Sequence, residues 1–289
     1  MAQSGTGRRT PLGVGVCSTM LSVTPNEHVT FKLHYEDADL LVIEKPARRV
    51  TQPGKGHETD TILNGLFFRF GKPLQNLGKA RDFGLLHRLD KMTSGLLLVA
   101  LRPKAYDALR AAFEARLVRK FYWAICQKAP KAVTGIINKP LLESEPRIGE
   151  TKTARIARSG KPAITAYRTL AVSPVAALIE ARPLTGRLHQ VRVHLDAIGC
   201  PILGDDLYAP PSFAEASPRL ALHAHRLAFT HPASGEPIDI HSAFPRDLRA
   251  LLKRLSLPRP DLPEEGAAEP REEAEEPELD AGGESVGDE

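Results

Sequence analysis

The central part of the chain predicts a domain of the α+β class. Short alternating or apolar runs typical of strands are interspersed with segments whose apolar residues recur at helical spacing. Of the 289 residues 42% are hydrophobic, which is enough for a sizeable core. No stretch approaches the roughly 20 apolar residues that cross a bilayer, so we expect a soluble, cytoplasmic protein.

The first half of the domain is expected to hold four strands and two helices. The strands are expected at 29–34, 40–44, 95–101 and 118–125. One helix is expected over 61–70 and a second over 103–117, where Pro103 suits a first turn. Its apolar positions are Tyr106, Leu109, Phe113 and Leu117. The strand at 118–125 alternates, which predicts one apolar face and one face with polar or reactive groups, namely Lys120, Tyr122 and Ala124.

The second half continues the mixed pattern. Segments 163–172 and 175–182 predict a hairpin, and 188–198 predicts a helix capped by Gly199. Further strands are expected at 220–229 and 237–240, and a basic amphipathic helix over 246–257 closes the domain.

Charge is distributed unevenly along the chain. The total is +4, but residues 261–289 carry 13 acidic residues and one arginine, a net charge of −12. Residues 1–260 carry 38 Lys and Arg against 22 Asp and Glu, a net charge of +16. A basic body favours a polyanionic partner, although surplus positive charge is also typical of an ordinary solvated surface. We expect a flexible arm over 1–27, a folded domain over 28–257 and a disordered acidic tail over 258–289.

The segment 84–95 concentrates polar groups between apolar runs. Asp90 is flanked there by Arg88 and Lys91, and nearby positive charge favours the ionised carboxylate. Such a carboxylate can act as a nucleophile. The alternative is a structural turn aspartate, followed by the turn residues Thr93, Ser94 and Gly95.

Two further segments could serve such a site. Residues 182–194 form a basic strand-to-helix junction suited to phosphate, where Arg187 adds bidentate donors and Arg192 could point inward toward an acid; a solvated basic turn is the alternative. Tyr122 could stack on an exposed base, or pack at a core edge.

Metal and cofactor sites are not indicated. The pairs His189/His194 and His223/His225 do not have the spacing of a zinc motif, and the three cysteines are too far apart for a zinc ribbon or a disulfide framework. Phosphate-loop, dinucleotide-binding and G-x-S-x-G patterns are also missing from the sequence.

Together these segments resemble the motifs of the RluA-type pseudouridine synthases, in the family's order from about residue 35 to 245. The matching segments are Glu44-Lys45-Pro46, His87-Arg88-Leu89-Asp90 with Thr93-Ser94-Gly95, Lys120-Phe121-Tyr122 with Ala124, Thr185-Gly186-Arg187 with His189-Gln190, Arg192 and His194, Pro201-Ile202-Leu203-Gly204-Asp205, and Leu222-His223-Ala224 with Phe229 and His231-Pro232.

The resemblance implies a mainly antiparallel mixed sheet flanked by helices and loops, with an active cleft across its middle. It implies an isomerase, without metal or cofactor and expected to be a monomer, that turns out uridine in ribosomal or transfer RNA and rejoins the base through C5. Asp90 would be the nucleophile, Tyr122 would stack on the base and Arg192 would orient Asp90. Contacts to RNA would come from His87, Arg88, Lys120, Arg187, His189 and Gln190.

This chain departs from the family pattern in a few places. Residues 1–27 are too short for the N-terminal S4-like domain of some relatives, Arg48-Arg49 and Cys126-Gln127 stand where glycine is common, and the acidic tail is not a family feature. We hypothesise that the tail competes with nonspecific RNA; deleting 261–289 should then strengthen nonspecific binding at low salt. A non-catalytic RNA-binding or chaperone protein, and a glycosidase-like hydrolase with a second carboxylate beside Asp90, are the alternatives.

Overall fold

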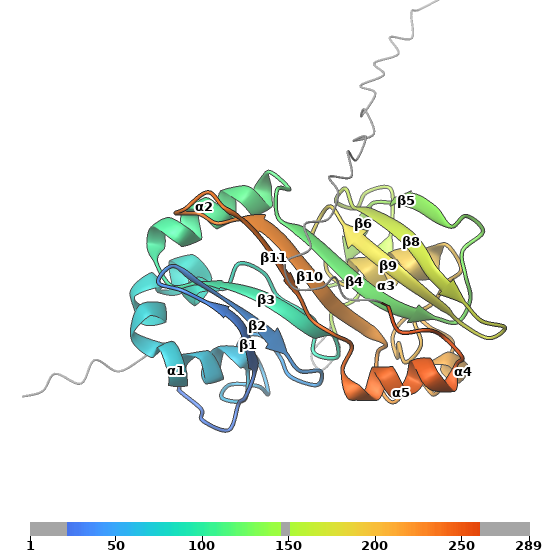
Figure 1. Cartoon of the computed structure of the whole chain (residues 1–289), viewed down its shortest axis with the longest axis horizontal. Helices are drawn as coiled ribbons and strands as arrows, with labels where there is room; N and C mark the ends of the chain where they lie inside the picture. The colour runs from blue at the N-terminus through green and yellow to red at the C-terminus, as the bar shows by residue number, and fades with distance from the viewer. Residues whose placement is uncertain (1–21, 146–150, 261–289) are drawn as a thin grey trace, which may run out of the picture. The chain divides into compact units, whose positions relative to one another are not determined.

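The computed structural model describes residues 22–145 and 151–260. Nine strands form one sheet in the order β1-β2-β3-β10-β4-β9-β8-β5, with β11 added beside β10 (Figure 1). Neighbouring strands are antiparallel except β3 and β10, which are parallel. A separate hairpin, β6–β7, forms a two-stranded sheet. The bounds are β1 (Lys32–Glu36), β2 (Leu40–Lys45), β3 (Ser94–Ala100), β4 (Arg119–Cys126), β5 (Thr134–Asn138), β6 (Leu141–Glu143), β7 (Ala154–Ile156), β8 (Ile164–Val172), β9 (Ala177–Pro183), β10 (Leu222–Thr230) and β11 (Pro237–His241).

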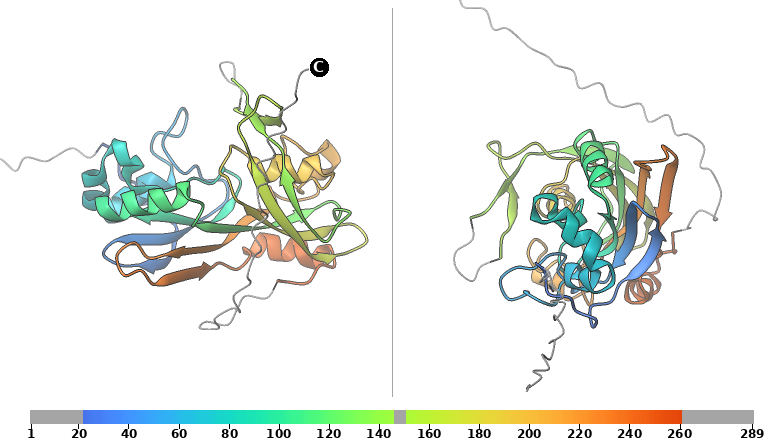
Figure 2. Two further views of the ribbon diagram at one scale, coloured as in Figure 1. Left: turned by 90° about the horizontal axis from the view of Figure 1, so that it is seen from above. Right: turned by 90° about the vertical axis from the view of Figure 1, so that its left-hand side faces the viewer.

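Helices cover both faces of this sheet. They are α1 (Ile62–Leu77), α2 (Pro103–Glu114), α3 (Gln190–Ala197), α4 (Pro211–Ala214) and α5 (Arg246–Arg254), with a 3₁₀ segment η1 (Lys79–Gly84) after α1. Figure 2 shows α3 and α5 on opposite faces of the half of the sheet that contains β9. The predicted α+β fold with a mainly antiparallel sheet is therefore confirmed.

The core consists of two main clusters that meet at the middle of the sheet. One joins β2 and β3 to α1 and α2, and the other joins β4 and β9 to α3 and α5. Tyr122 of β4 is partly buried and packs against both clusters. Side chains on the central strands therefore stand at the junction of the two halves, where the sequence motifs converge.

Most predicted elements are present, with shifted ends. β1 starts three residues later than predicted, and α1 runs past 70 to Leu77, with non-helical backbone angles at Phe70. Strands β5, β6 and β7 were not predicted. The body also begins before residue 28, because Val23 is buried and Asn26 donates its backbone N–H to the Asn64 carbonyl at 3.0 Å. The remainder of the predicted arm and residues 261–289 of the predicted tail lie outside the described residues.

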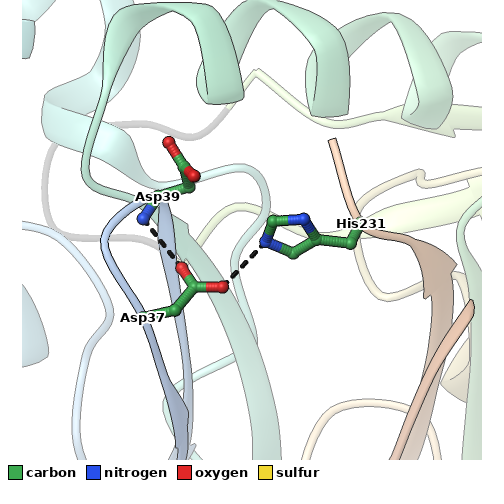
Figure 3. Close-up of side chains that lie close together, drawn as sticks. All are labelled: Asp37, Asp39 and His231. Atoms are coloured by element: carbon green, nitrogen blue, oxygen red, sulfur yellow. Dashed lines mark hydrogen bonds and ion pairs between the residues drawn. The ribbon is translucent and has the colours of Figure 1, made fainter. Parts of the chain in front are cut away.

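A hydrogen bond between Asp37 and His231 joins the turn after β1 to the end of β10 (Figure 3). The His231 Nε2 lies 2.7 Å from the Asp37 Oδ2, and the His231 Nδ1 accepts the Ser234 N–H at 3.0 Å. The second bond leaves the ring proton on Nε2, so His231 donates to Asp37. Asp37, Asp39 and His231 lie close enough to share a cation. However, hydrogen bonds already explain why these residues lie together, so we assign the cluster a structural role.

Candidate active site

A cleft of about 570 Å³ opens between the two halves of the sheet. Its walls come from the loop before β3, from α2 and β4, and from the segment between β9 and α3. All nine residues that the sequence singled out line it, namely His87, Arg88, Asp90, Lys120, Tyr122, Arg187, His189, Gln190 and Arg192. The folded chain thus brings three distant motifs into one site.

The loop that carries Asp90 is held by hydrogen bonds to Thr51 before the aspartate and by a turn after it. The Thr51 hydroxyl donates to the Leu89 carbonyl at 2.9 Å and accepts the Leu89 N–H at 3.3 Å. The Thr93 N–H donates to the Asp90 carbonyl at 3.1 Å and closes a turn. These bonds fix the backbone from which the Asp90 side chain enters the cleft.

Lys45, at the end of β2, supports the same loop from below. Its side chain is fully buried, and its ammonium donates to the carbonyls of Pro46, Arg49 and Lys91 at 2.9, 2.7 and 3.2 Å. Burial lowers the pKa of Lys45 to about 7, against the opposing effect of the Asp90 charge. Sequence reasoning placed Lys45 in a motif without a role, because its partners are backbone carbonyls that only the fold reveals.

Gly95 explains the last position of the Asp90 motif. Its φ is +126°, and a Cβ added there would lie 2.3 Å from the Ala224 carbonyl oxygen of β10. Only glycine allows β3 to approach β10 this closely directly after the Asp90 turn. The motif is thus a turn that carries Asp90, followed by the parallel strand pair at the centre of the sheet.

The Asp90 carboxylate faces two nitrogen-bearing side chains from the segment around α3. Its Oδ2 lies 3.7 Å from the Arg192 Nη1 and 3.9 Å from the His189 Nε2. The predicted Asp90–Arg192 pair is therefore confirmed. Arg192 is held more tightly by Asp205, which the sequence analysis placed in a matching segment without a role: the Arg192 Nε and Nη2 donate to the two Asp205 oxygens at 2.8 and 2.7 Å.

Asp205 is fully buried and organises the loop after α3. Its Oδ1 also accepts the N–H groups of Leu207 and Tyr208, both at 3.1 Å. The preceding Gly204 has a φ of +75°, and a Cβ added there would lie 2.0 Å from the Arg219 carbonyl oxygen. The Gly204-Asp205 segment therefore shapes the backbone that holds Arg192 in place.

The opposite wall of the cleft is the polar face predicted for β4. Burial and the negative charge of Asp90 raise the pKa of Tyr122, so its phenol stays protonated. Burial lowers the pKa of Lys120 to about 8, and its Nζ lies 5.4 Å from the centroid of the Phe113 ring. A flat aromatic group and a desolvated cation therefore line the cleft beside Asp90.

Two residues expected to contact RNA are engaged within the protein. Gln190 is 4% exposed; its amide oxygen accepts from the Thr185 hydroxyl at 2.8 Å and from the Arg187 N–H at 3.0 Å, and its amide nitrogen donates to β8. Gln190 therefore shapes the loop before α3, and its expected contact with RNA stays a prediction. The His87 Nε2 accepts the Leu98 N–H at 3.1 Å, and burial lowers the His87 pKa to about 3. His87 is thus a neutral side chain in the wall of the cleft. The contact with RNA that the sequence predicted would have to use its Nδ1, because Nε2 is already bonded.

The histidine pairs weighed as metal ligands have other partners. His194 is buried between the Thr165 hydroxyl and the Lys139 carbonyl, and His223 is buried between the hydroxyls of Ser94 and Ser242. Among residues 22–145 and 151–260, neither pair belongs to a group arranged to hold a metal ion. In the same residues, no helix is long and apolar enough to cross a membrane.

Comparison with known proteins agrees with this geometry. Residues 39–197 match the family described as RNA pseudouridylate synthase. A protein of Zymomonas mobilis named ribosomal large subunit pseudouridine synthase D is 36% identical over 239 residues, covering 80% of this chain and 74% of the relative. Synthase C of Vibrio vulnificus, similarly named, is 35% identical over 230 residues, covering 78% and 69%.

A solved structure of similar fold is human RNA pseudouridylate synthase domain containing 4. It matches with a TM-score of 0.61 and 28% identity, covering 80% of this chain and 95% of the human chain. The chain belongs to the RNA pseudouridylate synthase family. It is therefore an isomerase that converts uridine in RNA to pseudouridine, as the sequence predicted.

Proposed function

We propose that the chain modifies uridine in large-subunit ribosomal RNA, with Asp90 as the nucleophile. The observation that carries the catalytic part is the placement of the Asp90 carboxylate in the cleft, 3.7 Å from the Arg192 guanidinium and on the same cleft as Tyr122. The target is inferred from the names of relatives that match about four fifths of the chain.

In this proposal the target base enters between Tyr122 and Asp90. Tyr122 stacks on the uracil ring, a contact that every base offers. Asp90 bonds to C1′ as the N1–C1′ bond breaks, and the freed base turns so that C5 faces C1′. The C5–C1′ bond then forms as the Asp90–C1′ bond breaks, and C5 loses its proton while N1 gains one. Arg192 compensates the negative charge of Asp90 and fixes its orientation, while Asp205 holds Arg192 through two hydrogen bonds.

The rim of the cleft supplies the positive charge that RNA requires. Arg88 is exposed beside Asp90, and Arg187 lies on the opposite rim, where its Nε donates to the Pro162 carbonyl at 3.1 Å. Arg88 fills the gap that the displaced base leaves, and Arg187 and Lys120 contact phosphates. Each such contact releases counterions, so binding weakens as salt rises.

A glycosidase-like reaction is less well supported by the same geometry. It requires a second carboxyl group to act as acid or base opposite Asp90. The buried carboxylate that shares Arg192 with Asp90, Asp205, has both oxygens bound by Arg192. It cannot exchange protons with a substrate while it holds that ion pair.

The target is tested by mapping pseudouridine in ribosomal and transfer RNA from cells with and without the gene. We expect one or a few uridines of the large-subunit RNA to lose modification, and purified protein to restore them in a transcript. Loss of pseudouridine only in transfer RNA would show that the target is transfer RNA and would leave the assigned reaction unchanged. Free uracil released from the transcript would instead indicate hydrolysis.

A further inference from the structure

Tyr208 stands behind the active site, in the loop between α3 and α4. The Asp205 carboxylate that binds Arg192 also accepts the Tyr208 N–H at 3.1 Å. The Arg192 Cζ lies 5.0 Å from the centroid of the Tyr208 ring. Tyr208 therefore contacts the arginine that faces Asp90 in two ways: its backbone N–H shares the Asp205 carboxylate with Arg192, and its ring packs against the guanidinium.

The Tyr208 hydroxyl has two partners, from different parts of the fold. It accepts the N–H of Ala154, in β7, at 2.9 Å. It also lies 2.7 Å from the Nδ1 of His189, whose ring meets the Tyr208 ring edge-on at 77°. One oxygen thus connects the β6–β7 hairpin to the histidine that faces Asp90.

The two bonds favour one nitrogen of His189 as the carrier of the ring proton. A backbone N–H can only donate, so the hydroxyl accepts from Ala154 and keeps its own proton to give. Within the described part of the chain, the acceptor in reach of that proton is the His189 Nδ1. An Nδ1 that accepts leaves the ring proton on Nε2, the atom 3.9 Å from the Asp90 Oδ2.

His189 is held for this purpose in a backbone conformation that costs energy. Its φ is +51°, in the left-handed region that residues other than glycine rarely adopt. Burial lowers the pKa of His189, against the opposing effect of Asp90, which favours the neutral ring with one proton. The site therefore presents a single N–H to the carboxylate.

We propose that Tyr208 is a positioning residue for the isomerisation: its hydroxyl fixes the His189 tautomer so that Nε2–H points at Asp90, and it ties this contact to the β6–β7 hairpin. The hydrogen bond from Ala154 to Tyr208 connects to the cleft itself, because Ala154 pairs with Glu143 and Glu143 lines the cleft. This inference rests on the proposed role of Asp90 as the nucleophile.

The variant Tyr208→Phe tests the proposal, because it keeps the ring beside Arg192 and removes only the hydroxyl. In wild-type protein free of RNA, ¹⁵N NMR of the imidazoles should show His189 as the Nε2–H tautomer; Tyr208→Phe should give a mixture. We expect kcat to fall roughly 10-fold, as for other residues that orient a functional imidazole, with KM changed less than about 3-fold. Tyr167→Phe, whose hydroxyl makes no hydrogen bond among the described residues, should change neither.

A double variant guards against a merely structural effect. In a His189→Asn background, Tyr208→Phe should lower kcat no further, because the two residues act through one contact. An unchanged tautomer in Tyr208→Phe, or a second loss in the double variant, would overturn the proposal. The tautomer is measured without RNA, so a wrong RNA target would leave this result intact.

Discussion

The two faces of the sheet around β4 both carry charged residues, but opposite charges lie at different distances on the two faces. On the face away from the cleft, Glu180 lies 3.0 Å from both Arg168 and His225, and Arg226 lies 2.6 Å from Asp239. On the cleft face, the Asp90 carboxylate has nitrogen neighbours only at 3.7 and 3.9 Å. Lys120 has no carboxylate within 4 Å among the described residues.

This difference separates structural charge from reactive charge. Close pairs on the back face bring opposite charges together and connect the neighbouring strands β8, β9, β10 and β11. On the cleft face the opposite charges are farther apart, so Asp90 and Lys120 can still form close contacts with a substrate. Changes on the cleft face should therefore affect isomerisation, and changes on the back face should affect stability alone.

The largest effect is expected for Arg192→Met. The change leaves the buried Asp205 carboxylate without its partner, which should destabilise the fold by about 3–5 kcal/mol and abolish measurable conversion. Arg168→Met, at the half-exposed back-face pair, should cost less than about 1 kcal/mol and leave the rate unchanged. Denaturant unfolding and single-turnover assays measure both.

A second variant distinguishes stability from chemistry at this pair. Arg192→Met with Asp205→Asn removes both charges together and keeps an oxygen acceptor for the Leu207 and Tyr208 N–H groups, so it should regain most of the lost stability. It should not regain conversion, because Asp90 still lacks its guanidinium. Recovery of both would reduce Arg192 to a structural residue.

Sequence reasoning found the elements with strong periodicity and the residues within compact motifs. It predicted β2, β3, α2 and the β8–β9 hairpin, since each has a clear apolar pattern, and it placed Asp90 and Arg192 together. It missed β6 and β7 because three-residue strands carry too little pattern to detect. It did not predict that the Gln190 amide bonds within the protein, because polarity alone does not show which way an amide points.

The remaining gaps at the site share one physical cause. Lys45, Asp205 and Tyr208 act through backbone groups or through partners far away in sequence, such as the Tyr208 hydroxyl on the Ala154 N–H. Their roles depend on which chain segments the fold brings together. Motif reading identifies the groups that face the substrate more readily than those that hold them.

The next largest effect concerns the aromatic wall. Tyr122→Leu removes the ring proposed to stack on the base, so kcat/KM should fall roughly 10- to 100-fold, the equivalent of one base–aromatic stack. Phe121→Leu alters the neighbouring ring on the opposite face of β4 and should change kcat/KM less than about 3-fold. Equal losses in the two variants would mean that strand packing, rather than stacking, limits the rate.

The smallest effect is expected for Lys120→Met. Removing one phosphate contact should lower the slope of log binding constant against log salt by about 1, whereas the exposed Lys131→Met should leave it unchanged. Folding lowers the Lys120 pKa from 10.5 to about 8, so the folded protein binds fewer protons than the unfolded chain between these pH values. Wild-type stability should therefore rise from pH 8 to 10.5, and the variant should lack this contribution in denaturant titrations.

Asp90→Asn tests the central claim most directly, because the amide matches the carboxylate in size but cannot act as the nucleophile. Single-turnover conversion and binding should be measured together on a large-subunit RNA fragment, with the back-face Glu180→Gln as the matched control. We predict that Asp90→Asn binds within about 3-fold of wild type while conversion falls on the order of 10⁴-fold, and that the control converts normally. Conversion by Asp90→Asn within tenfold of the wild-type rate would contradict the assignment of Asp90 as the nucleophile.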